Sequence, residues 1–170
     1  MFLKSVLAGC VTLAAASIVL AGPPLICHAH DIGSAKSLPW KNDGTPNWNT
    51  PDPVYPVRQL SADTLRLLEP GTPVLVRMET LRRAAIYGMR DHAAARELLS
   101  GLMQRATRHP DAAMASFDYG CFLASLNQMK SWYKEDLSAG VDGSEYVKTA
   151  AALKPDPEIR SALTTIQSFR

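Results

Sequence analysis

The stretch that most constrains the fold is residues 112–133, "AAMASFDYGCFLASLNQMKSWY", which is apolar on almost every side of a helical wheel. A helix with this pattern has no face that prefers water, so other elements must cover it. The segments around it carry apolar residues three and four positions apart, and no stretch alternates strictly as a strand would. The sequence therefore predicts an all-α domain over residues 60–170 with this helix as its most buried element.

Helix-start residues divide this domain into short units. Ser61 is expected to cap the first helix, Asp91 the third and Asp156 the last. Asp91 follows the preceding helical pattern almost immediately, and such a short connection folds two helices back on each other. The sequence thus predicts antiparallel helix pairs, arranged as a short helical-repeat-like array or as an irregular bundle.

Two junctions, "HPDAAMASFDYGCFL" and "AAALKPDPEIRSAL", resemble those of tetratricopeptide repeats, in which a helix ends near an alanine and a proline and the next helix begins shortly afterwards. The spacings from Pro110 to Gly120 and from Ala150 to Pro155 match that family. Pro110 and Pro155, however, lie farther apart than the family's repeat of about 34 residues. The resemblance covers about residues 72–162.

This resemblance implies that the first helix of each pair lines a concave groove for an extended peptide. A ligand with an acidic side chain or a C-terminal carboxylate beside an apolar side chain would suit such a groove. Phe117 and Cys121 lie one turn apart on a very apolar helix, so core packing is the alternative role for them. The groove positions carried over are Arg83, Tyr87 and Arg90 in the first pair, and Phe117, Cys121 and Ser125 in the second.

Residues 1–29 have the parts of an export signal. A single cation, Lys4, precedes an uncharged apolar run, and helix breakers then lead to small residues at Cys27 and Ala29. The apolar run is short for a membrane span of about 20 residues. We expect a signal peptide, cut after Ala29 or alternatively after Ala21, and a periplasmic or extracellular protein that meets a membrane only during export.

Residues 30–59 form a predicted arm between the signal and the helical domain. Prolines recur from residue 39 to residue 56 and interrupt every possible helix, so the arm is expected to be extended. Trp40, Trp48 and Tyr55 are spaced along it. Exposed rings would leave apolar surface in water, so we expect them to dock on the helical body rather than on a partner.

Charge and cysteine content exclude several classes of function. The chain has 18 basic and 16 acidic residues without a basic cluster, so no nucleic-acid partner is predicted. A cut after Ala29 would leave Cys121 as the remaining cysteine, and the exported domain must then be stable without an internal disulfide. The hydrolase elbow, the zinc-protease helix, the haem-attachment motif and the calcium loop are each incomplete, so no cofactor or metal is predicted.

The sequence leaves two other functions open. A secreted hydrolase could use Asp118, Glu135 and Asp136, because Asp118 lies on an apolar helix where burial would raise its pKa. Asp118 could instead pair with Arg82 or Arg83 in a structural role.

The second alternative is copper binding. After a cut at Ala29, His30 would offer a terminal amine and an imidazole, and His92 or His109 would have to complete the site. The favoured interpretation remains an exported helical module that binds a protein or a peptide and is not an enzyme.

Overall fold

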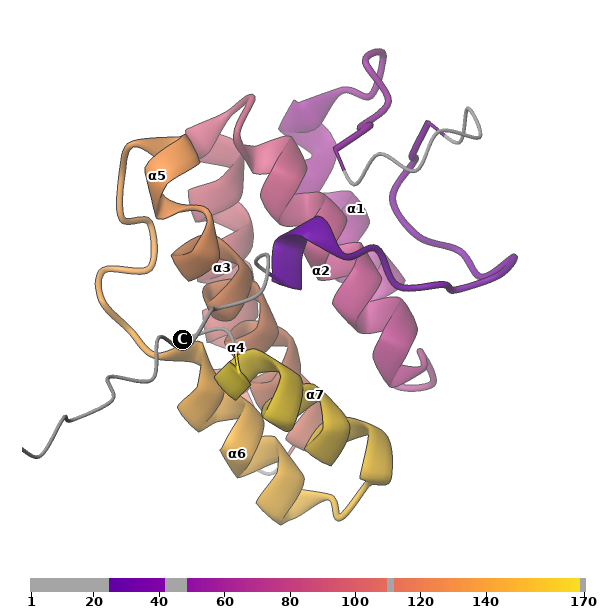
Figure 1. Ribbon diagram of the computed structural model, residues 1–170, viewed down its shortest axis with the longest axis vertical. Helices are drawn as coiled ribbons and strands as arrows, with labels where there is room; N and C mark the ends of the chain where they lie inside the picture. Colours follow the sequence, from indigo (N-terminus) through magenta and orange to yellow (C-terminus); the bar gives the residue numbers. More distant parts are fainter. Residues whose placement is uncertain (1–24, 42–48, 110–111, 169–170) are drawn as a thin grey trace, which may run out of the picture.

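The computed structural model describes residues 25–41, 49–109 and 112–168 (Figure 1). Within them every regular element is a helix, and the strand-like pairing is an isolated antiparallel bridge between Trp40 and Pro51. The predicted all-α class is confirmed. No helix of this described part is both long and apolar enough to cross a membrane. The predicted signal peptide, residues 1–29, lies outside the described residues except for its last five.

Helix α4 lies between two groups of helices, with α1, α2 and α3 in one group and α6 and α7 in the other. Helices α2, α3 and α4 pack on one another, α1 covers α2 and α3, and α6 lies along α4 with α7 beside it (Figure 1). The elements in chain order are η1 (Leu25–Cys27), η2 (Val57–Gln59), α1 (Leu60–Leu67), α2 (Val74–Gly88), α3 (His92–Arg108), α4 (Ala113–Gln128), α5 (Lys130–Tyr133), α6 (Gly143–Leu153) and α7 (Pro157–Ser168).

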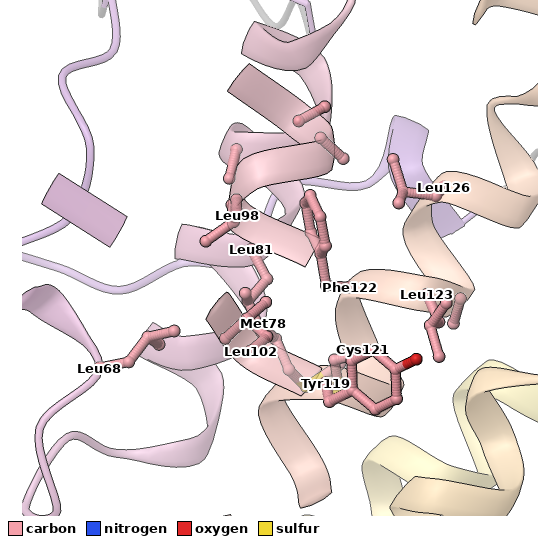
Figure 2. Packing of buried hydrophobic residues seen from close by; sticks show 14 of the residues in the cluster. Leu68, Met78, Leu81, Leu98, Leu102, Tyr119, Cys121, Phe122, Leu123 and Leu126 are labelled. Carbon is pink, nitrogen blue, oxygen red and sulfur yellow. The ribbon is translucent and has the colours of Figure 1, made fainter. Parts of the chain in front are cut away.

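Helix α4 is buried on nearly all sides, as its sequence predicts. Its Phe122 belongs to the same buried cluster as Leu81 of α2 and Leu98 and Leu102 of α3, and Figure 2 shows its ring on the side of Leu81 and Leu98 while Leu123 points toward α6 and α7. Burying a large apolar side chain stabilises a fold by about 1.5–3 kcal/mol. This central cluster therefore fixes where the surrounding helices lie.

The predicted caps at Asp91 and Asp156 are confirmed. Asp91 accepts hydrogen bonds from the backbone N–H groups of Ala93 and Ala94, at 3.0 and 3.1 Å. Asp156 accepts one from Glu158 at 2.9 Å. Since only three residues separate α2 from α3, these two helices run antiparallel.

Two predicted helix boundaries are wrong. Ser61 is not a cap, because η2 runs directly into α1 and the backbone N–H of Leu60 already bonds to Val57. The apolar helix does not continue to residue 133. It ends at Gln128, and the chain turns so that the hydroxyl of Tyr133 donates to the Ala85 carbonyl at 2.5 Å.

Helices α4 and α6 approach closely at a pair of glycines. A Cβ atom on Gly120 would lie 2.5 Å from the carbonyl oxygen of Gly143 and 2.9 Å from Val147, and a Cβ on Gly143 would collide with the Gly120 carbonyl. Backbone cannot move aside as a flexible side chain can. The small residue that the sequence resemblance singles out thus permits this helix crossing.

We expect Gly120→Ala to lower the free energy of unfolding by about 1–3 kcal/mol, because the methyl group forces α4 and α6 apart. Urea unfolding monitored by circular dichroism measures this change. Gly71→Ala is the control, since a Cβ at Gly71 meets nothing within 4 Å. Equal stability of the two variants would contradict the close crossing.

Candidate functional site

One face of α2, together with Arg90 in the turn that follows it, binds the N-terminal segment of the chain by its backbone. The side chains of Glu79, Arg82, Arg83, Tyr87 and Arg90 make up this arm-binding face. Their donors reach main-chain carbonyls: Arg82 to Ile26 at 3.0 Å, Arg83 to Leu38 at 2.8 Å, Tyr87 to Pro39 at 2.5 Å, and Arg90 to Asp52 and Pro53 at 3.1 Å each. The face holds an extended polypeptide, and that polypeptide is the chain's own.

Glu79 is the centre of this face, with 0% of its surface exposed. Arg82 donates to both of its carboxylate oxygens at 2.7 and 2.8 Å, and Arg83 donates at 2.7 Å. The backbone N–H of His30 adds a bond at 3.0 Å. Burial raises the pKa of Glu79, but the hydrogen bonds and charges of Arg82 and Arg83 outweigh burial and lower it overall.

Sequence reasoning did not single out Glu79. The available signal was its spacing, because Arg82 and Arg83 follow at positions i+3 and i+4 and so lie on the same side of the helix.

The aromatic residues of the arm pack on the same face. The Trp40 ring lies under the guanidinium groups of Arg82 and Arg83, at 5.1 and 5.4 Å, and edge-on to Tyr87. The Tyr55 ring is 4.5 Å from that of Tyr87. Cation–π contacts of this kind add about 0.5–2 kcal/mol each. Docking on the helical body is therefore confirmed for these two rings, while Trp48 lies outside the described residues.

The six predicted groove residues do not form one surface. Arg83, Tyr87 and Arg90 lie together under the arm, whereas Phe117 and Cys121 are buried in the core. Ser125 is half-buried and donates to the Cys121 carbonyl at 3.0 Å. Burial raises the pKa of the Cys121 thiol well above its usual value, which suppresses its reactivity.

An open cleft lies on the other side of α2, and we call it the basic cleft. Its volume is about 810 Å³, and it lies between the end of α1, the start of α2, the end of α3, the start of α4 and the end of α6. Charged groups on its wall stand next to apolar ones. Its lining residues include Leu65, Arg77, Arg105, His109, Met114, Asp118, Leu153 and Lys154.

A buried ion pair forms the floor of the basic cleft. Arg77 donates to Oδ2 of Asp118 at 2.5 Å and to the backbone carbonyls of Thr72 and Glu69. Asp118 therefore pairs with Arg77, and not with Arg82 or Arg83 as the structural alternative had it. Burial raises the Asp118 pKa to about 7, against the lowering effect of Arg77 and Arg105.

The second oxygen of Asp118, Oδ1, is buried and accepts no hydrogen bond from the residues that the structure describes. Arg105 lies above this floor. It is half-buried, and its guanidinium group is held by the carbonyls of Leu65, at 2.8 Å, and Leu68.

The carboxylates proposed for hydrolysis do not converge. Glu135 pairs with His92 and Arg96 at the first turn of α3, while Asp118 lies in the cleft at that helix's far end. Asp136 pairs with Lys130 at 2.9 Å. A 17-residue helix is about 25 Å long, so an acid and a base at its two ends cannot act on one bond.

About the same distance separates His92, the first residue of α3, from His109, which follows its last residue. Within the described residues, no three or more His, Cys, Asp and Glu side chains form a group that would hold a metal ion. His92 pairs with Glu135 and His109 lines the basic cleft, so neither of the imidazoles that the copper hypothesis requires lies at His30, whose backbone N–H is bound to Glu79 on the other face of α2.

Comparison with known proteins identifies no relative. No family model matches the chain, and neither a curated protein nor a solved structure matches it. The tetratricopeptide resemblance accordingly stays a prediction, and the function has to be argued from the geometry of the site.

We expect Glu79→Gln to destabilise the fold by about 3–5 kcal/mol, because it leaves the buried Arg82 without its counter-charge. Chemical unfolding of the purified protein measures the loss. Glu97→Gln on the exposed side of α3 is the matched control and is expected to change stability by less than about 0.5 kcal/mol. A loss no larger than that of the control would contradict the central role of Glu79.

The raised pKa of Asp118 is expected to make the stability of the fold depend on pH. Its pKa is about 3.9 in an unfolded chain and about 7 in the fold. Folding therefore favours its protonated form, and its ionisation weakens the fold progressively from pH 4 to pH 7. Over that range the stability of the wild type should fall relative to Asp118→Asn by something on the order of 3 kcal/mol. Parallel stability–pH curves for the two proteins would show that Asp118 does not titrate in this way.

Proposed function

We propose that the protein is an exported helical interaction module that binds a segment of a partner protein in the basic cleft. The observation that carries this proposal is an open cavity in which cationic and apolar side chains stand next to each other above a buried Arg77–Asp118 pair. Its volume of about 810 Å³ is within the range of about 300–1,000 Å³ that ligand sites occupy.

The arm-binding face is less suited to this role, although it contains three of the groove residues predicted from sequence. Its donors are engaged by the chain's own carbonyls, and Trp40 covers its arginines. A partner there would first have to displace the arm. The basic cleft requires no such displacement.

The lining of the cleft supports a definite ligand chemistry. Arg105 is held in place by backbone carbonyls, and Lys154 and His109 lie at the same opening. Leu153, 46% exposed, and the half-buried Met114 supply apolar surface beside these cations. A peptide with a side-chain or C-terminal carboxylate next to an apolar side chain would satisfy both groups.

The proposal also covers the pairing of the helices and the roles of the two N-terminal segments. We interpret α2–α3 and α4–α6 as two antiparallel pairs of a short repeat-like array, supported by the close glycine crossing in the second pair. An export signal begins the chain, and residues 30–59 are an arm that covers the first pair. The protein then works outside the cytoplasm without a cofactor.

Selection from a phage-displayed library of random 12-residue peptides tests the proposed function. We expect enriched peptides to carry an acidic residue or a free C-terminus beside an apolar residue. Their affinity, measured by fluorescence anisotropy with synthetic peptides, should fall at least about tenfold in Arg105→Ala and in Leu153→Asp.

Two exposed positions away from the cleft provide matched controls. Arg160→Ala removes a cation from α7, and Val54→Asp adds a charge at a residue that is 84% exposed. Both should bind the selected peptides as the wild type does. If the cleft variants also bind normally, the peptide site lies elsewhere and the proposal fails.

A further inference from the structure

We infer that residues 25–30 stay in the mature protein and that the leader is removed upstream of them, after Ala21. The inference rests on the proposed export and changes the processing site that the sequence favours, which is the bond after Ala29. The bond after Ala21 lies outside the described residues, and the contacts that support this cut lie on its C-terminal side.

Ile26 is a core residue of the helical domain. Only 1% of its surface is exposed, and it belongs to the same apolar cluster as α2 and α4. Its backbone N–H donates to the side chain of Gln128 on α4, and its carbonyl accepts from Arg82 on α2, both at 3.0 Å. These contacts to distant parts of the chain are those of a structural element, not of a segment that is discarded.

A cut after Ala29 would remove this element and open the core beneath it. Ile26 lines a cavity of about 20 Å³ whose other lining residues include Met78, Cys121 and Ile166. Without Ile26 that cavity would become a hollow open to solvent, and Arg82 would lose an acceptor. Large apolar residues are not left exposed in this way without a cost in stability.

The same cut would also add a positive charge at a site that already holds two cations for one carboxylate. The backbone nitrogen of His30 lies 3.0 Å from Glu79, which Arg82 and Arg83 already neutralise. Hydrolysis after Ala29 would turn this amide into a terminal ammonium group. A third cation would then face one buried carboxylate, which is unfavourable in a poorly solvated site.

Hydrolysis after Ala21 avoids both problems. The reaction adds one water, leaving a carboxylate on Ala21 and a new amino terminus on Gly22, and an export peptidase is the class of enzyme that carries it out. Ala21 is a small residue at the end of the apolar run, as such a cut requires. Everything from Ile26 onward then remains in the fold.

Intact-mass spectrometry of the protein exported by its own leader is the first test. We expect a mass that starts at Gly22. A mass that starts at His30 in the exported fraction would overturn this inference and leave the proposed export standing. A cell-retained protein that starts at Met1 would overturn the export proposal as well, so the two failures are distinguishable.

Thiol labelling tests whether Ile26 is a core residue that shields the buried side chains next to it. In a chain that starts at Gly22 and carries Cys27→Ser, Cys121 is the one thiol, and it should react slowly with an aromatic disulfide reagent. Adding Ile26→Ala to that chain should raise its labelling rate at least about tenfold, because a side chain that lines the same cavity as the thiol is lost. Val54→Ala in the same chain is the control, since Val54 is exposed. Equal labelling rates for the two variants would overturn the inference.

Discussion

The fold depends on burial of the Glu79 carboxylate between two arginines of its own helix. An ionised carboxylate cannot stay in a protein interior without compensation. Arg82 and Arg83 provide it, and because each guanidinium group has further N–H donors, each also binds a backbone carbonyl of the N-terminal segment. Neutralising one buried charge and holding the segment in place are therefore a single network of hydrogen bonds.

This network explains how an extended, proline-rich segment can lie against a helical body without forming a sheet. Backbone carbonyls that are removed from water need donors, and here side chains of α2 provide them to Ile26, Leu38 and Pro39. The Trp40 ring covers the same arginines. Helix α2 is consequently buried on two sides, with apolar residues toward α3 and α4 and polar residues toward the segment.

The sequence was sufficient for features that depend on local chemistry. The helical periods, the caps at Asp91 and Asp156 and the docking of Trp40 were predicted correctly, because each follows from neighbouring residues or from the cost of exposed rings. The pairing of Asp118 with Arg77 and the turn after Gln128 were not, since both depend on which helices meet in space. Arg82 and Arg83 were equally plausible partners for Asp118 until Glu79 was seen to engage them.

The two buried carboxylates show why we place the partner-binding site in the basic cleft. Glu79 receives donors on both of its oxygens and lies under the chain's own segment, so nothing about it calls for an external ligand. Asp118 shares an equally buried setting, yet one of its oxygens finds no donor in the described part of the chain, and it lies at the floor of an open cavity. Incomplete satisfaction of a buried polar group weakens a fold. Its place beneath a cleft lined by cations and apolar side chains is why we propose this cleft, and not the arm-binding face, as the binding site.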